Sequence, residues 1–297
     1  MKVLLATDGS QNADAAAQLI ASLTKSGQEL DLIYVSAIQI PDLQFAHGHT
    51  KFRAAYVREQ TGKFEAAQSR ARQILDSNCS TTQTVIREGH PGQVILEAAK
   101  EFEVDLIVIG AVGDSMLDYV LFGSTSNFVA THADRSVLVV RPPKAPSSRP
   151  PKFLISFDGS VASKVGIDDL VQSGWAINSE VNLLTVAHVP GTFAELENHQ
   201  EILAATKESM QREMQPLQKE LESVCQSINA SVVEADHVGR EILRSAESQS
   251  SDVIVMGSTG RGLVARFLLG SASRYVLQHS ARSVWIARDS KAAEDRS

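Results

Sequence analysis

The sequence is poor in the features that define several large classes of protein. It contains only two cysteines, Cys79 and Cys225, which favours two reduced, buried thiols in a cytoplasmic protein over a disulfide between the halves of the chain. No apolar run approaches the roughly 18 residues of a membrane-spanning helix, and the amino terminus turns polar too early for a signal peptide. Lysine and arginine form no cluster, and the formal net charge of -7 argues against nucleic acid as a partner. We therefore expect a cytoplasmic protein with neither a membrane nor a nucleic-acid partner.

What the chain does contain is typical of a protein with two globular domains. Its 297 residues are enough for two separate cores, and 43% hydrophobic and 21% charged residues are ordinary values for such domains. The sequence also repeats: MKVLLATDGS at the start matches PKFLISFDGS from Pro151, and SVLVVRPP from Ser136 matches SVWIARDS from Ser283. A proline-rich segment between the copies is typical of a stiff linker. We predict a first domain over residues 1–143, a linker over 144–150, a second domain over 151–290 and a polar tail over 291–297.

Each copy alternates short β-forming runs with helical patterns. This alternation predicts βαβ units, and therefore an α/β fold with a parallel sheet covered by helices on both faces. A proline at position 216 is expected to kink the long second helix of the second copy or to end its first segment. In the first copy, strands are expected near 2–7, 31–36, 82–87, 105–110 and 136–141, and helices near 12–25, 52–77, 92–102 and 123–133. In the second copy, strands are expected near 152–157, 180–187, 230–236, 252–257 and 283–287, and helices near 161–173, 195–226, 239–249 and 270–280.

Each copy also contains a glycine-rich junction between a buried strand and a helix. In the second copy the junction is GSTGRGLVARFLLGS, residues 257–271, and the first copy has the same glycine spacing from Gly110 to Ser124. The shared pattern is Gly, two residues, Gly, nine residues, Gly, Ser. Glycine lets a backbone approach a ligand closely, and the first turn of a helix offers unpaired N–H groups to an anion. The junctions therefore predict a phosphate-binding loop in each copy.

With this spacing and the Asp-Gly-Ser sequences at Asp8 and Asp158, the chain resembles the ATP-binding branch of the universal stress protein family over nearly its whole length. The resemblance implies two tandem Rossmann-like (adenine nucleotide alpha hydrolase-like) domains, each with a five-stranded parallel sheet of order 3-2-1-4-5. A ligand would then lie where the strand order reverses, between strands 1 and 4. Taken alone, Asp-Gly-Ser is equally typical of a tight turn followed by a helix N-cap, and the glycine loop across the crevice favours the ligand site.

The resemblance also implies which residues would hold ATP. The aspartate after strand 1 would contact the nucleoside, the backbone at the end of strand 2 would meet the adenine, and the junction would receive the ribose and phosphates, with Mg²⁺ or Mn²⁺ accompanying the triphosphate. No catalytic residue and no metal ligand from the protein is predicted. The site residues carried over to the first copy are Asp8, Val35, Gly110, Gly113, Gly123, Ser124 and Thr125. Those carried over to the second copy are Asp158, Val186, Met256, Gly257, Gly260, Arg261, Gly270, Ser271 and Ala272.

The two junctions differ in charge. The second contains Arg261 and Arg266 between its second and third glycines, whereas the first contains Asp114 and Asp118 there. Near a triphosphate an arginine adds a charge-assisted contact, while an aspartate repels unless a cation intervenes. This difference predicts tighter nucleotide binding in the second copy and weaker or more Mg²⁺- or Mn²⁺-dependent binding in the first.

Three functions remain open at this stage. We favour an ATP-binding, nucleotide-responsive stress or signalling module. A slow ATPase or an autophosphorylating enzyme that uses Ser124 or Ser271 is an alternative, but no general base can be named for it. A scaffold with a vestigial site that binds AMP or nothing is disfavoured, because a loop without a ligand would have little need of its glycines. Ser126 and Ser273, two residues farther on, either reach a phosphate or face solvent.

The last strand of each copy would leave an unpaired sheet edge, and such edges invite pairing. The resemblance implies dimerisation through this strand. In a tandem chain the two copies would then pair with each other inside one molecule. A homodimer of the whole chain through another surface is a further expectation.

Overall fold

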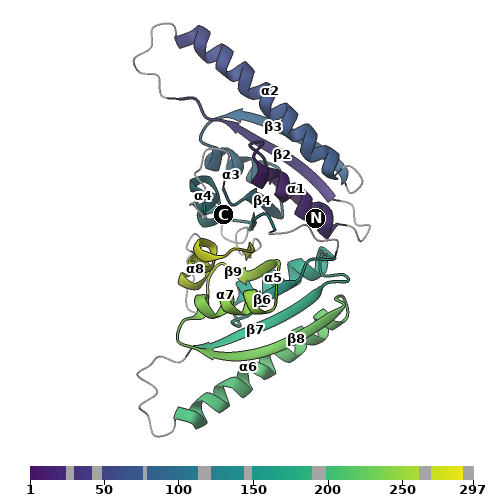
Figure 1. Cartoon of the computed structure of the whole chain (residues 1–297), viewed down its shortest axis with the longest axis vertical. Coiled ribbons are helices and arrows are strands. Elements are labelled where there is room, and N and C mark those ends of the chain that lie inside the picture. Colours follow the sequence, from purple (N-terminus) through teal and green to yellow (C-terminus); the bar gives the residue numbers. More distant parts are fainter. Residues whose placement is uncertain are drawn as a thin grey trace. The chain divides into compact units, whose positions relative to one another are not determined.

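The computed structural model describes residues 1–24, 30–41, 49–75, 79–112, 122–143, 149–188, 199–260 and 269–289. The chain divides into two compact units, Met1–Pro142 and Pro143–Ser297. Within the described ranges each unit contains five parallel strands that alternate with helices (Figure 1). The predicted α/β class is therefore confirmed.

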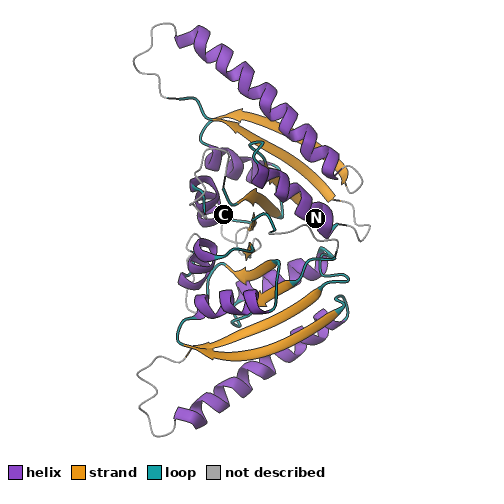
Figure 2. Ribbon diagram, viewed as in Figure 1, coloured by secondary structure: helices purple, strands orange, loops and turns teal. Residues whose placement is uncertain are grey.

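In the first unit the strands lie in the order β3-β2-β1-β4-β5, which confirms the predicted order. Helices α1 and α2 pack on one face of the sheet and α3 and α4 on the other (Figure 2). The elements are β1 (Lys2–Ala6), α1 (Gln11–Leu23), β2 (Leu30–Ile38), α2 (His49–Leu75), β3 (Cys79–Glu88), α3 (Pro91–Glu101), β4 (Leu106–Gly110), α4 (Ser124–His132) and β5 (Ser136–Val140).

The second unit repeats this arrangement, with the strands in the order β8-β7-β6-β9-β10. Helices α5 and α6 cover one face and α7 and α8 the other. The elements are β6 (Phe153–Ser156), α5 (Val161–Gln172), β7 (Glu180–His188), α6 (His199–Glu222), β8 (Ser227–Ala235), α7 (Val238–Ser248), β9 (Val253–Gly257), α8 (Ser271–His279) and β10 (Ser283–Ala287).

The central strands are buried on both faces, which explains why they appear in the sequence as short continuous apolar runs. Every residue of β4 and of β9 is buried. The chain leaves β1 toward α1 on one face of the sheet and leaves β4 toward α4 on the other. Because neighbouring strands whose connections diverge in this way leave a crevice at their carboxyl ends, the topology alone places a cavity there.

Helix α6 passes through Pro216 as one continuous helix, so the predicted end of a first segment at this proline is wrong. Proline removes one backbone N–H from the helix ladder. Met214, Leu217 and Leu221 on the same helix are buried. The packing of this apolar face outweighs the lost hydrogen bond, as is usual for helices in folded proteins.

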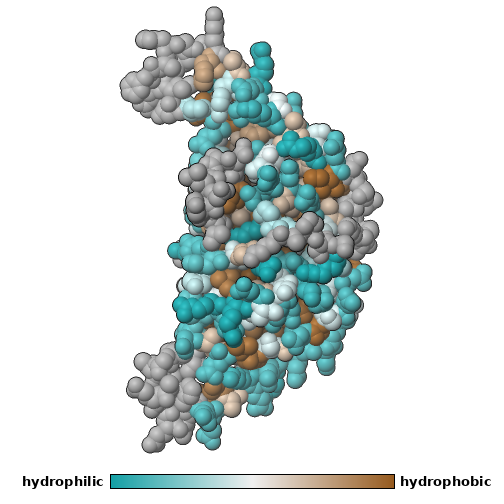
Figure 3. Space-filling model, viewed as in Figure 1, coloured by the Kyte–Doolittle hydropathy of each residue, from teal (hydrophilic) through white to brown (hydrophobic). Residues whose placement is uncertain are grey.

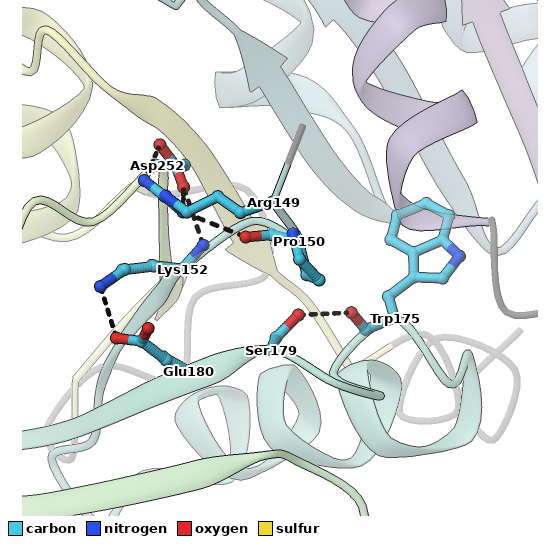
Figure 4. Close-up of polar contacts among 7 residues, drawn as sticks. All are labelled: Arg149, Pro150, Lys152, Trp175, Ser179, Glu180 and Asp252. Atoms are coloured by element: carbon cyan, nitrogen blue, oxygen red, sulfur yellow. Dashed lines mark hydrogen bonds and ion pairs between the residues drawn. The ribbon is translucent and has the colours of Figure 1, made fainter. Parts of the chain in front are cut away.

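An aspartate before the fourth strand of each unit holds the start of the first strand. In the second unit the Asp252 carboxylate accepts hydrogen bonds from Arg149 Nη1 at 2.7 Å and from the Lys152 backbone N–H at 2.8 Å (Figure 4). In the first unit the Asp105 carboxylate accepts the Lys2 backbone N–H at 2.7 Å. In both units the same hydrogen bond therefore ties the start of the first strand to the start of the fourth. In the second unit Arg149 adds an ion pair with Asp252.

The surface seen in Figure 3 is mainly hydrophilic, with apolar residues scattered over it. Among the described residues the large hydrophobic side chains that are exposed are Phe52, Val161, Ile177 and Ile202, which come from four different places in the sequence. Of the helices in the described ranges, none has the length and apolar character needed to span a membrane.

Candidate functional site

A cavity of about 240 Å³ lies at the carboxyl ends of β1 and β4 in the first unit. Its walls come from the turn after β1, the end of β2, the start of α3 and the junction from β4 to α4. The structure thus brings together every site residue predicted for this copy within the described ranges, while Gly113 lies outside them. The lining residues are Ala6, Thr7, Asp8, Ser10, Ala13, Val35, Ala37, Gln39, Pro91, Ile95, Ile109, Gly110, Val112, Gly123, Ser124, Thr125 and Ser126.

A cavity of about 230 Å³ occupies the corresponding place in the second unit. Its lining contains Asp158 and the described junction residues that were predicted for this copy. It does not contain Val186, and Arg261 lies outside the described residues. The lining residues within the described ranges are Ser156, Asp158, Val238, Ile242, Met256, Gly257, Thr259, Gly260, Gly270, Ser271, Ala272 and Ser273.

The Asp-Gly-Ser sequences form the tight turn that was one of the two interpretations. Asp8 Oδ1 accepts the backbone N–H of Ser10 at 3.0 Å, and Ser10 Oγ caps α1 by accepting the N–H of Ala13 at 3.3 Å. Gly9 has a φ of 82°, in the left-handed region that favours glycine. Asp8 is nevertheless exposed and lines the cavity. The turn and the site are therefore compatible, because the turn holds the carboxylate at the mouth of the cavity.

The first glycine of each junction is required by packing within the protein. A Cβ at Gly110 would lie 2.9 Å from the backbone carbon of Asn12, and a Cβ at Gly257 would lie 2.7 Å from the backbone nitrogen of Ser163. The start of α1 or α5 therefore approaches the strand too closely for any side chain. The prediction that a loop without a ligand would have little need of its glycines is therefore wrong for the first glycine of each junction, which packing requires.

The later glycines of each junction are less tightly enclosed by the described residues than the first glycine. Among the described residues, a Cβ at Gly260 would meet the end of the Asp158 side chain, with Oδ2 at 3.1 Å, so the loop lies next to this carboxylate. Gly123 and Gly270 are the N-caps of α4 and α8, and neither helix has a side-chain cap. Uncapped N–H groups at a helix start favour an anion. In each cavity an anion would therefore be most favourable at the junction.

Ser126 and Ser273 do not face solvent, which was one of the two predicted alternatives, and the other, a contact with phosphate, stays a prediction. Both side chains are buried. Ser126 Oγ lies 2.8 Å from the carbonyl oxygen of Gly110, and Ser273 Oγ donates to that of Gly257 at 2.8 Å. The hydroxyls therefore hold the first turn of α4 or α8 against the end of the preceding strand, because each one satisfies a strand carbonyl.

Sequence matching misaligned the second strands of the two units. Ala6 pairs with Val35, and its counterpart Ser156 pairs with Leu184. The Val35 and Leu184 carbonyls accept the N–H of the next residue after β1 and β6, respectively, at 2.9 Å in both units. Leu184 is thus the counterpart of Val35, and Val186 is two residues too far along. Val186 corresponds to Ala37.

The structure also shows a contact to the first turn that could not be predicted from the sequence. Arg70 of α2 donates from Nη2 to the carbonyl oxygen of Gly9 at 3.2 Å, and its Nε lies 3.8 Å from Asp14 Oδ2. Arg70 thereby ties α2 to the turn that holds Asp8. A contact between residues 61 positions apart has no local signal in the sequence.

Burial is the main cause of the shifted pKa values of Arg141 and Cys225. Burial lowers the pKa of Arg141 to about 10, which leaves the guanidinium charged at neutral pH. Its Cζ lies 5.8 Å from the ring centroid of Phe122, the residue before Gly123, so a cation–π contact supports the start of α4. Burial also raises the pKa of the free thiol of Cys225. In the part of the chain that the structure describes, no group of three or more His, Cys, Asp or Glu residues could hold a metal ion.

Two doubly wound units, each with a cavity at the reversal of strand order, define a tandem Rossmann-like protein. The sequence profile described as the Universal stress protein family matches residues 1–141 and again residues 151–288. The chain belongs to the universal stress protein family.

Relatives cover either one unit or parts of both. The universal stress protein Sll1388 of Synechocystis is 31% identical over 150 residues, which cover 47% of this chain and 97% of that protein. The universal stress protein Rv1996 of Mycobacterium tuberculosis is 27% identical over 212 residues, which cover 66% of this chain and 63% of that protein. The match thus spans less than two thirds of the length of that relative.

Solved structures share the fold over nearly the whole chain. A universal stress protein of Archaeoglobus fulgidus matches with a TM-score of 0.66 at 20% identity and covers 97% of this chain and 96% of its own. A putative universal stress protein of Pseudomonas aeruginosa matches with a TM-score of 0.63 at 18% identity, covering 98% of this chain and 94% of its own. At these identities the likeness establishes the fold.

Proposed function

We propose that this chain is an ATP-binding universal stress protein that acts as a nucleotide-responsive stress or signalling module in the cytoplasm. The observation that supports the proposal most is a cavity, found in both units, with an aspartate on one wall and an uncapped helix start on the other. An anion favours the helix start, and a hydroxyl-rich sugar favours the carboxylate. A ribose that carries a phosphate chain has hydroxyls for the aspartate at one end and an anion for the helix start at the other.

In the first unit each part of an adenine nucleotide has a complementary wall. The backbone N–H groups of Ser124 and Thr125 would bind the phosphates, and Asp8 would accept hydrogen bonds from ribose hydroxyls. The apolar side chains of Val35 and Ile95 would contact the adenine ring. Mg²⁺ or Mn²⁺ would arrive with the triphosphate, and the protein residues would orient the nucleotide around it.

Titration calorimetry of the full chain with ATP and Mg²⁺ tests the proposal. We expect saturable binding with a dissociation constant in the micromolar range, which corresponds to about -8 kcal/mol. Adenosine alone should bind more weakly, because the helix start then has no anion to hold. An absence of saturable heat up to millimolar ATP would contradict the proposal.

An enzyme remains the alternative, because the hydroxyls of Ser124 and Ser271 line the two cavities. A slow ATPase would release phosphate in proportion to protein, and an autophosphorylating enzyme would label one of these serines. The discriminating variant is Ser271→Ala together with Ser124→Ala. Loss of phosphate release or labelling in this variant, with ATP binding retained, would favour the enzyme over the binding module.

For the assembly we propose that the last strands, β5 and β10, pair within one chain. Each strand is an edge of the sheet of its own unit, and an unpaired edge is a template for another strand. Sedimentation of the full chain at its monomer mass of 32.1 kDa is the expected result. Twice that mass would favour a homodimer of the chain.

A further inference from the structure

The two cavities differ on the wall formed by the second strand of each sheet. In the first unit Val35, Ala37 and Gln39 lie two residues apart along β2 and its extension, and all three line the cavity. Side chains two apart on a strand share a face. Pro91 and Ile95 at the start of α3 line the opposite wall. The result is a slot with two largely apolar walls, which suits a flat aromatic ring.

The second unit has a larger side chain at each of the two inner positions of this wall. The strand pairing makes Leu184 the counterpart of Val35, and Val186 the counterpart of Ala37. Among the described residues, none from β7 lines the second cavity. The added methyl and methylene groups therefore occupy the space where the first unit has its slot.

The junction side of the second cavity keeps its described glycines and its helix start. It keeps Gly260, Gly270 and the start of α8 at Ser271. It also has a polar Ser156 where the first unit has Ala6. The second cavity thus keeps the groups that would hold a phosphate chain. Val238 and Ile242 of α7 still line it, but it lacks the strand wall of the slot.

We propose that the two sites divide the recognition of the ligand: the first selects the purine base, and the second binds the phosphate chain and gains no affinity from the base. The inference rests on the proposed nucleotide function and specifies the ligand class of each site. Val35 and Ala37 in the first unit, and Leu184 and Val186 in the second, are the specificity-determining residues. A single methylene in an apolar pocket changes affinity by about tenfold or more, so these differences are large enough.

The chain offers one matched reporter in each cavity. Ile109 and Met256 directly precede the first glycine of the two junctions, and each lines its own cavity. Methyl NMR of the full chain, with isotope label in the isoleucine and methionine methyl groups, therefore observes the two sites separately. The probes are adenosine, inorganic tripolyphosphate and ATP.

We expect adenosine to shift the Ile109 methyl saturably and to leave the Met256 methyl unchanged. Tripolyphosphate should shift both. ATP should bind at least about tenfold more tightly than tripolyphosphate at the first site and with nearly equal affinity at the second. Saturable adenosine binding at Met256 with the affinity seen at Ile109 would overturn the inference and leave the proposed function intact. No response of either methyl to ATP or tripolyphosphate would instead refute the proposed function.

Reciprocal variants identify the residues responsible. Leu184→Val with Val186→Ala should give the Met256 methyl a saturable response to adenosine. Val35→Leu with Ala37→Val should weaken adenosine binding at Ile109 by at least about tenfold. Both pairs are conservative apolar changes, and retained tripolyphosphate binding in each variant shows that the site is still folded. If the variants bind tripolyphosphate normally and respond to adenosine as the unmodified protein does, these four residues do not determine base specificity.

Discussion

Replacing Gly257 with alanine is expected to lower the free energy of unfolding by about 1–3 kcal/mol, the usual cost of forcing an extra group into a packed core. The new Cβ would lie 2.7 Å from the Ser163 backbone nitrogen and 3.0 Å from the Ala162 backbone carbon. Backbone atoms at a helix start cannot move aside as a flexible side chain can. The helix α5 must therefore shift away from β9. Urea unfolding followed by circular dichroism measures the loss.

Gly260→Ala is the matched control in the same junction. Among the described residues, its Cβ would meet the terminal oxygen of a flexible side chain, Asp158, so the free energy of unfolding should change by no more than about 0.5 kcal/mol. This variant should instead weaken phosphate binding in the second unit, because its methyl group would crowd Asp158, which lines the cavity with Gly260. If Gly257→Ala and Gly260→Ala had equal stabilities, the first glycine would not be a packing residue.

Replacing Asp8 with alanine is expected to weaken ATP binding in the first unit by about tenfold to a hundredfold. Hydrogen bonds to a charged group contribute about 1.5–3 kcal/mol, and the carboxylate would accept them from the ribose hydroxyls. Alanine also removes the oxygen that accepts the Ser10 N–H at 3.0 Å, so the turn loses the bond that holds it. Calorimetry with ATP measures the change in affinity.

Asp8→Asn separates these two effects. The asparagine oxygen can still accept the Ser10 N–H, so the turn should survive, while the negative charge is lost. We expect a smaller loss of affinity than with alanine and an unchanged stability. Tighter ATP binding by Asp8→Asn would mean that Asp8 faces the phosphates, and the proposed orientation of the nucleotide would then be wrong.

The sequence predicted the α/β class and, together with the family resemblance, part of the lining of each cavity. Duplicated blocks such as MKVLLATDGS and PKFLISFDGS indicated two copies, and the buried apolar runs indicated parallel strands. The resemblance supplied the strand order, which the structure confirms in both units. With that order, the carboxyl ends of β1 and β4 must meet, and so Asp8 and Gly110 line one cavity.

Contacts between distant segments were beyond what the sequence could predict. The counterpart of Val35 depends on hydrogen bonds from β1 and β6 to their neighbours, which a pattern of apolar residues does not specify. The packing role of Gly257 depends on how closely α5 crosses β9, and the role of Arg70 depends on where α2 meets the first turn. The predicted ranking of the sites by charge rests on Asp114, Asp118, Arg261 and Arg266, which lie outside the described residues, and it stays a prediction.

The central claim is that the cavity between β1 and β4 binds an adenine nucleotide. A crystal structure of the full chain grown with millimolar ATP and Mg²⁺ tests it most directly. We expect the adenine ring to lie between β2 and α3, the ribose to contact Asp8, and the phosphates to accept hydrogen bonds from the first N–H groups of α4. A first cavity that stays empty under these conditions, or that is filled by the protein's own side chains, would contradict it.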